Sequence, residues 1–153
     1  MFDLSSITYK SLGGTKFWLL FVDKYTGFKK SYFLCTKNQV NEKRLEFIHF
    51  LLLNGIKVKY FRCDNMAENE KFKEKIVEIG MDACFEFSAP GTPQQNVKVE
   101  RVFATLYGRV QAMLNYAHVE GDIWAECGKT STDLDGILYG KDQTENSYTK
   151  MFK

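Results

Sequence analysis

Hydrophobic positions in the first part of the chain alternate between strand-like and helix-like spacing. Residues 16–23 (KFWLLFVD) are rich in aromatic and aliphatic side chains and predict a buried strand, followed by a turn that ends at Gly27. Residues 28–34 then predict the return strand of a hairpin. The pattern continues with a helix over 41–54, a strand over 57–64, a helix over 68–79 and a short strand over 83–87.

The second part of the chain is predicted to be mainly helical. Both prolines fall within residues 88–95, which predicts a loop. A long helix is expected from Asn96, because apolar residues recur there at helical spacing: Val99, Val102, Phe103, Leu106, Val110, Met113, Leu114 and Ala117. Two shorter helices are expected over 122–129 and within 130–139, the last interrupted at Asp135-Gly136. Residues 140–153 are expected to form a tail. This order predicts a single mixed α/β domain over 1–153.

Composition and charge narrow the class of protein. With 44% hydrophobic and 26% charged residues, the chain suits a globular domain, and no apolar run is long enough for a membrane helix. We therefore expect neither membrane insertion nor secretion. The four cysteines and two histidines show no zinc-binding spacing. Residues 1–117 carry a net charge of +5 and residues 118–146 carry −5, which permits a polyanionic partner on the basic part.

Three carboxylates are candidates for chemistry because of where they fall. Asp3 lies where a first strand would begin, and Asp64 lies at the carboxyl end of a predicted strand, where α/β sheets expose side chains to a crevice. Glu100 lies in the first turn of the long helix, about 100° from the centre of its apolar stripe. Converging carboxylates suit magnesium. Position alone leaves ordinary alternatives open: a turn at Asp64 and a helix-dipole role for Glu100.

Several motifs strengthen the case for these carboxylates. The chain contains Arg62-Cys63-Asp64-Asn65 followed by Glu68, and Thr92-Pro93-Gln94-Gln95-Asn96 followed by Val99-Glu100-Arg101. Together with Gly13–Asp23 and Trp124-Ala125-Glu126, they cover about residues 3–139. The combination resembles the integrase catalytic core of copia-type (Pseudoviridae-like) LTR retrotransposons, within the retroviral-integrase and RNase H-like superfamily.

The resemblance implies a fold, a chemistry and a set of site residues. It implies an RNase H-like α/β fold with a central mixed five-stranded sheet flanked by helices, and a D-D-E polynucleotidyl transferase. Asp3, Asp64 and Glu100 would hold two Mg²⁺ or Mn²⁺ ions for 3′-end processing and strand transfer. Second candidates, for supporting the site or contacting nucleic acid, are Asn65, Glu68, Gln94, Gln95, Asn96 and Arg101.

The resemblance also implies partners and a location, and the sequence departs from the family at three points. Expected partners are DNA, as element ends and target, and further copies of the chain, acting in the nucleus after a stage in cytoplasmic virus-like particles. Met66 and Val97 stand where the family has glycine, and only two residues precede Asp3, so a truncated first strand is expected. Two alternatives remain open: an RNase H-like nuclease that only hydrolyses, and a truncated or co-opted copy that binds nucleic acid without catalysis.

Overall fold

The computed structural model describes residues 1–64, 67–88, 97–140 and 144–153, with backbone only for 63–64, 67–68 and 87–88. Its strands are β1 (Phe2–Ser6), β2 (Phe17–Val22), β3 (Lys29–Leu34), β4 (Tyr60–Asp64) and β5 (Cys84–Ser88). Its α-helices are α1 (Val40–Leu53), α2 (Ala67–Glu78), α3 (Val97–Ala117), α4 (Trp124–Ile137) and α5 (Ser147–Phe152), and short 3₁₀ turns precede α1 and α4. Within these residues, no helix is both long enough and apolar enough to cross a membrane.

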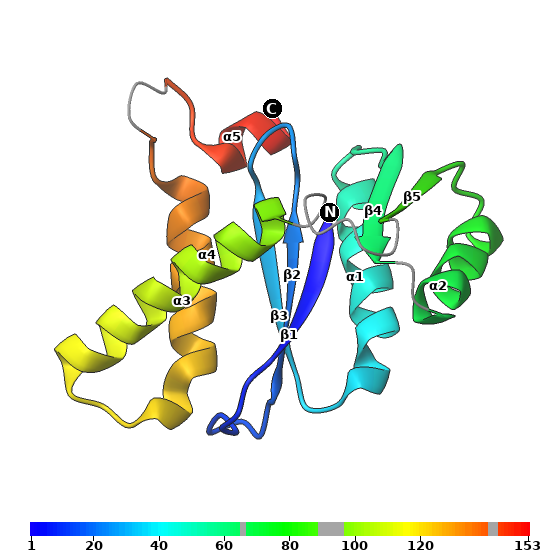
Figure 1. Ribbon diagram of the computed structural model, residues 1–153. Helices are drawn as coiled ribbons and strands as arrows, with labels where there is room; N and C mark the ends of the chain where they lie inside the picture. Colours follow the sequence, from blue (N-terminus) through cyan, green and yellow to red (C-terminus); the bar gives the residue numbers. More distant parts are fainter. Residues whose placement is uncertain (65–66, 89–96, 141–143) are drawn as a thin grey trace.

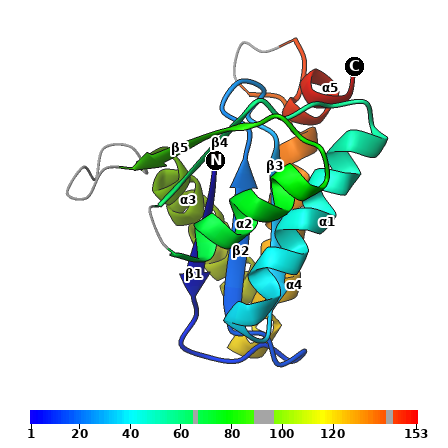
Figure 2. The same ribbon diagram turned by 90° about the vertical axis from the view of Figure 1, so that its right-hand side faces the viewer.

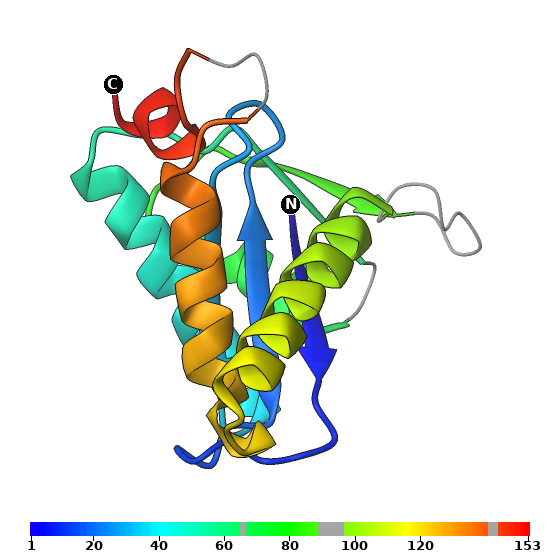
Figure 3. The ribbon, with the colours of Figure 1, turned by 90° about the vertical axis from the view of Figure 1, so that its left-hand side faces the viewer.

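The elements form three layers, with the strands in the middle (Figure 1). Helices α1 and α2 cover one face of the strands (Figure 2), and α3 and α4 cover the other (Figure 3). Strand β2 explains this arrangement, because its side chains alternate between the two faces and nearly all of them are buried. Leu19 and Phe21 pack in the core beneath α1 and α2, whereas Trp18, Leu20 and Val22 pack against α3 and α4. The predicted hairpin and the predicted α/β class are confirmed.

The five expected strands are present, but their hydrogen bonds divide them into two sheets. In the described residues, β1, β2 and β3 form an antiparallel sheet, and β4 pairs with β5 in a parallel one. The expected mixed arrangement of antiparallel and parallel strands is thus present, with the hydrogen bonds of the described residues assigned separately to β1–β3 and to β4–β5. Strands β1 and β4 are in contact along a boundary that we call the β1–β4 seam. Side chains fill this seam region: the Phe2 ring meets Phe72 of α2 edge-on at 5.9 Å, and the buried Arg44 of α1 lies 4.2 Å above Phe2.

Helix α4 is continuous, which corrects the expectation of two helices over 122–129 and within 130–139, the second interrupted at Asp135-Gly136. The Asp135 carboxylate accepts hydrogen bonds from Lys29 of β3 and Arg109 of α3, so this turn of α4 is held by tertiary contacts. A partly buried chain of hydrogen bonds further fixes α4 on the sheet. The Trp18 indole N–H donates to Ser31 Oγ at 2.8 Å, and Ser31 Oγ lies 2.7 Å from Thr132 Oγ1 on α4.

The predicted tail contains a further helix, α5, which packs against the body. Asn146 caps this helix by accepting a hydrogen bond from the Thr149 N–H at 2.8 Å. The Phe152 ring meets Phe28 edge-on, with ring centroids 5.1 Å apart, and the Ser147 hydroxyl donates to the Gly136 carbonyl of α4. These contacts close the end of the sheet beside the β2–β3 turn (Figure 1).

Candidate active site

Asp3 is fixed within a hydrogen-bonded strand. It pairs with Leu20 in the antiparallel β1–β2 register, and Leu20 belongs to the core under α3 and α4. Because paired residues in a sheet point to the same face, Asp3 is directed to the side of α3. Its Oδ1 accepts a hydrogen bond from the Leu4 N–H at 2.8 Å, and the Met1 amino group donates to the Val22 carbonyl at 2.9 Å. The position of Asp3 is therefore well anchored despite the short segment before it.

A tyrosine on α3 connects this helix to β1 beside Asp3. The Tyr107 hydroxyl donates to Ser5 Oγ at 2.9 Å, and Ser5 shares the strand face of Asp3. Burial raises the pKa of Tyr107 above its usual value of 10. The hydrogen bond to Ser5 acts in the opposite direction, and the negative charge of Asp3 raises the pKa further. Asp3 is thus one of the charges that act on the Tyr107 hydroxyl.

Glu100 lies on the same flank of α3 as Tyr107 and is exposed. The two residues are seven positions apart, so they are separated by two turns, about 10 Å along the helix axis. Asp3 precedes Ser5 by two residues on one face of β1. The beginning of α3 and the beginning of β1 lie at the same end of the molecule (Figures 1 and 3). Asp3 and Glu100 therefore belong to the sides of β1 and α3 that the Tyr107–Ser5 hydrogen bond joins, and Glu100 is exposed.

The remaining candidates lie partly or wholly outside the described residues. Asp64 is the last residue of β4, paired with Ser88 of β5, and β4 adjoins β1, but the Asp64 side chain is outside the description. For Glu68 the structure gives only a place in α2. Arg101 is an exposed residue of α3 that lines a groove together with Lys98. Candidate residues outside the described residues are Asn65, Gln94, Gln95 and Asn96.

The donor chemistry of this region suits a hard divalent cation. Asp3 and Glu100 offer carboxylate oxygens, which Mg²⁺ and Mn²⁺ prefer, and Asp64 would add a third carboxylate from the neighbouring strand. Among the described side chains, a set that omits Asp64, no group of three or more His, Cys, Asp or Glu residues could hold a metal ion. The three-carboxylate site therefore stays a prediction. The structure describes the side chains of Asp3 and Glu100 but not that of Asp64.

One feature of the site was not anticipated from the sequence: the hydrogen bond from Tyr107 to Ser5, which joins α3 to β1. Val97, which stands where the family has glycine, is the first residue of α3, in agreement with the helix expected from Asn96. Met66, the other departure from glycine, lies outside the described residues.

Sequence comparison links the chain to a mobile element. No family model matches it. Over 129 residues, or 82% of the chain, it is 33% identical to the Retrovirus-related Pol polyprotein from transposon TNT 1-94 of Nicotiana tabacum. The chain spans about 10% of the length of that polyprotein. The match therefore concerns one segment of a much longer protein.

Comparison of folds points to one class of solved structures. A chain of the simian T-cell lymphotropic virus intasome in complex with PP2A regulatory subunit B56 gamma aligns with a TM-score of 0.76 and 13% identity, covering 99% of this chain and 53% of that one. The HTLV-2 integrase catalytic core domain in complex with magnesium aligns at 0.66 and 13%, covering 99% and 93%. The BIV integrase catalytic core aligns at 0.67 and 16%, covering 98% and 90%.

These findings agree with one another and with the motifs. The fold is that of retroviral integrase catalytic cores over nearly the whole chain, and the sequence is related to a retrotransposon Pol polyprotein over most of it. In sequence the chain is thus similar to a segment of a retrotransposon Pol polyprotein, and in fold it is similar to integrase catalytic cores.

Proposed function

We propose that this chain is the catalytic core of an integrase that processes the 3′ ends of element DNA and joins them to target DNA. The observation that carries this proposal is the placement of Asp3 on the strand face turned toward the α3 flank that bears Glu100. This arrangement supports a site to which two carboxylates from segments almost a hundred residues apart would both contribute. The HTLV-2 integrase catalytic core domain, which shares the fold, has been solved in complex with magnesium.

The proposed metal ligands are Asp3, Asp64 and Glu100. A pair of divalent ions at such a site activates water or a 3′ hydroxyl and stabilises the leaving oxygen at phosphorus. The protein's own contribution is position. The Tyr107–Ser5 hydrogen bond holds α3 against β1, and β1 is held by its pairing with β2. Candidates for supporting the ligands or contacting DNA, in addition to Arg101, are Asn65, Glu68, Gln94, Gln95 and Asn96.

The proposal extends to assembly and location. Related integrase cores have been solved in dimeric and trimeric forms and within an intasome, which supports action by more than one copy. Two DNA ends joined to one target require more than one active site. Joining to chromosomal DNA would take place in the nucleus.

The test is removal of one carboxylate charge. Glu100→Gln keeps the size of the side chain and removes an anionic ligand, so Mn²⁺-dependent nicking and joining of a labelled DNA end should fall roughly hundredfold or more. Thermal unfolding should be unchanged because Glu100 is exposed. Glu74→Gln, which removes the same charge from an exposed position on α2, is the matched control and should keep full activity.

The products separate the proposal from its alternatives. Strand transfer gives products longer than the labelled substrate, whereas a nuclease that only hydrolyses gives shorter ones. Activity that survives Glu100→Gln would move the catalytic role to another acid. Absence of any metal-dependent product from the unaltered chain, with DNA binding retained, would favour the non-catalytic copy.

A further inference from the structure

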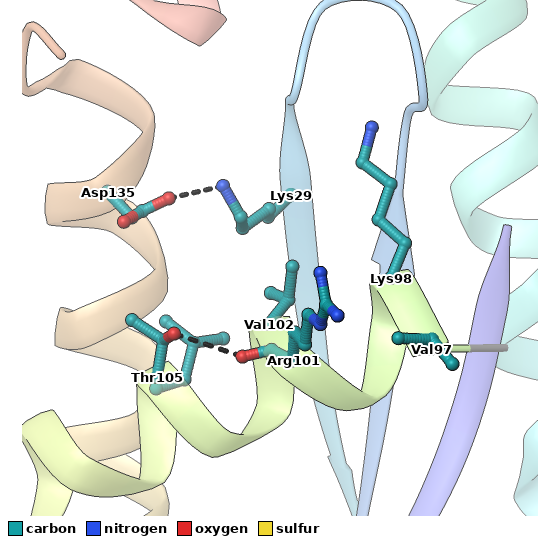
Figure 4. A pocket seen from close by; sticks show the side chains of 8 residues that line it. Lys29, Val97, Lys98, Arg101, Val102, Thr105 and Asp135 are labelled. Carbon is teal, nitrogen blue, oxygen red and sulfur yellow. Dashed lines mark hydrogen bonds and ion pairs between the residues drawn. The ribbon is translucent and has the colours of Figure 1, made fainter. Parts of the chain in front are cut away.

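A groove lies beside the first turns of α3, between this helix, α4 and the start of β3 (Figure 4). It has a volume of about 630 Å³. Its lining includes three cationic side chains, Lys29, Lys98 and Arg101, and one carboxylate, Asp135. We call it the basic groove. It lies on a different side of α3 from Glu100, because at about 100° per residue Lys98 lies about 200° and Arg101 about 100° around the helix from that residue.

The charges of the groove are arranged in two levels. At its inner side, Asp135 binds both Lys29 and Arg109, and the Lys29 and Asp135 side chains are only 15% and 17% exposed. These charges are therefore engaged with one another. Lys98 and Arg101, by contrast, are exposed residues one turn apart on α3, with Cβ atoms about 5–6 Å apart. The outer level thus presents two cations available to an anionic ligand.

The β2–β3 turn extends this surface. Lys98 Nζ donates to the Lys24 carbonyl at 2.9 Å, which joins the turn to the first turn of α3. An ammonium group has three donors, so Lys98 keeps two for a ligand. The next residue, Tyr25, is 96% exposed, and Lys24 is exposed as well. The nearby Asp23 carboxylate accepts hydrogen bonds from the Thr26 N–H and hydroxyl, each at 2.7 Å. These hydrogen bonds stabilise the Asp23 charge within the turn.

Successive cations beside an exposed aromatic ring suit a strand of nucleic acid. Lys and Arg neutralise successive phosphates, while a Tyr ring offers a surface on which an unpaired base can stack. We propose that the basic groove binds the sugar–phosphate backbone of an unpaired DNA strand through Lys98 and Arg101, with a base stacked on Tyr25. This inference rests on the proposed function for its choice of DNA, and it assigns a strand-binding surface on a different side of α3 from Glu100.

The test measures binding without catalysis. The full chain is titrated into a labelled 20-nucleotide single strand in EDTA at several salt concentrations. Lys98→Ala with Arg101→Ala should weaken binding about tenfold at low salt and reduce the slope of log affinity against log salt by about 1 to 2. Lys71→Ala with Lys73→Ala removes the same charge from exposed positions on α2 and should leave affinity and slope within twofold of the unaltered chain.

Tyr25→Ser tests the stacking. It should weaken binding of the single strand about tenfold and leave binding of a blunt duplex of the same sequence unchanged. Equal losses of single-strand affinity in the α3 and α2 double variants, or no binding by the unaltered chain at any salt concentration, would overturn the proposal that the basic groove binds DNA. Equal single-strand affinity of Tyr25→Ser and the unaltered chain would overturn the stacking. Because no metal is present, binding that depends on Lys98 and Arg101 stands even if strand transfer is never observed.

Discussion

At the scale of single residues, Asp135 connects three elements through one carboxylate. It lies on α4 and accepts hydrogen bonds from Lys29 on β3 and Arg109 on α3. Burial alone would raise the pKa of Asp135, but the hydrogen bonds from Lys29 and then Arg109 outweigh burial and lower it below the usual 3.8. The ionised form is therefore favoured more strongly in the folded chain than in the unfolded one.

This linkage predicts an acid-dependent contribution to stability. Asp135→Asn should lower the free energy of unfolding by about 2 kcal/mol at pH 7, because it removes charge-assisted hydrogen bonds. Since the pKa is lower in the folded state, the contribution is full above the unfolded pKa and disappears as the pH falls below about 4. Urea denaturation at pH 7 and pH 3 measures both values. The mutant and the unaltered chain should differ much less at pH 3.

The matched control is a variant of the surface ion pair between Glu145 and Lys153. In this pair, Glu145 Oε1 and Lys153 Nζ are 2.8 Å apart. Glu145→Gln removes a similar pair from a more exposed site, where solvent screens the charges. We expect no measurable change in unfolding at pH 7. An equal loss in both variants would mean that the three-element connection through Asp135 has no special effect.

At the scale of elements, the packing of α4 on the sheet depends on a missing side chain. A Cβ atom at Gly128 would lie 2.9 Å from Phe33 Cζ and 3.2 Å from the Trp18 ring. Both rings are packed in the core, and Trp18 is fully buried. Gly136, two turns later in the same helix, has nothing within 4 Å of the corresponding point. The two glycines therefore offer a matched comparison.

Opposite effects of the same substitution are expected at these positions. Gly128→Ala should destabilise the chain by about 1–3 kcal/mol, because the rings must move to admit the methyl group. Gly136→Ala should stabilise it by up to about 1 kcal/mol, because alanine is the better helix former. Thermal unfolding of the two single variants tests this. Equal shifts in the same direction would contradict the close approach of α4 to Phe33.

The elements also indicate what the sequence could and could not predict. The hairpin, α1, α2 and α3 follow from local spacing of apolar residues, and the structure confirms them. The continuity of α4 does not, because Asp135-Gly136 reads locally as a helix break, while its partner Lys29 lies 106 residues away in sequence. At the site, Asp3 and Glu100 could be singled out by motif, but the Tyr107–Ser5 bond between their elements depends on the tertiary fold.

At the scale of the whole molecule, α3 separates two surfaces. One flank carries Glu100 and Tyr107 toward β1, and the other carries Lys98 and Arg101 over the basic groove. Between them, the apolar stripe of α3 is buried against Trp18 and its neighbours. A DNA strand held in the groove would reach the carboxylate edge by passing over the first turn of the helix. Binding and chemistry would then depend on different side chains of one element.

This separation predicts different kinetic effects for the two surfaces. In strand-transfer assays, Lys98→Ala with Arg101→Ala should raise the KM for DNA about tenfold and leave kcat within about twofold. Glu100→Gln should lower kcat and have much less effect on KM. Steady-state rates over a range of DNA concentrations distinguish these outcomes. A fall in kcat of the lysine–arginine double variant would assign those residues to the chemistry instead.

The β1–β4 seam has a consequence for motion. Asp3 and Asp64 stand on opposite sides of a boundary at which the described backbone ladders stop, so we expect the two sheets to unfold as separate cooperative units. A two-stranded unit is marginal by itself, and we expect the backbone amides of β4 and β5 to exchange with deuterium well before those of β2. Ions that bind both carboxylates would bridge the boundary and slow that exchange. Metal binding would then stabilise the contact between the two sheets, and hydrogen exchange at individual backbone amides would measure this stabilisation.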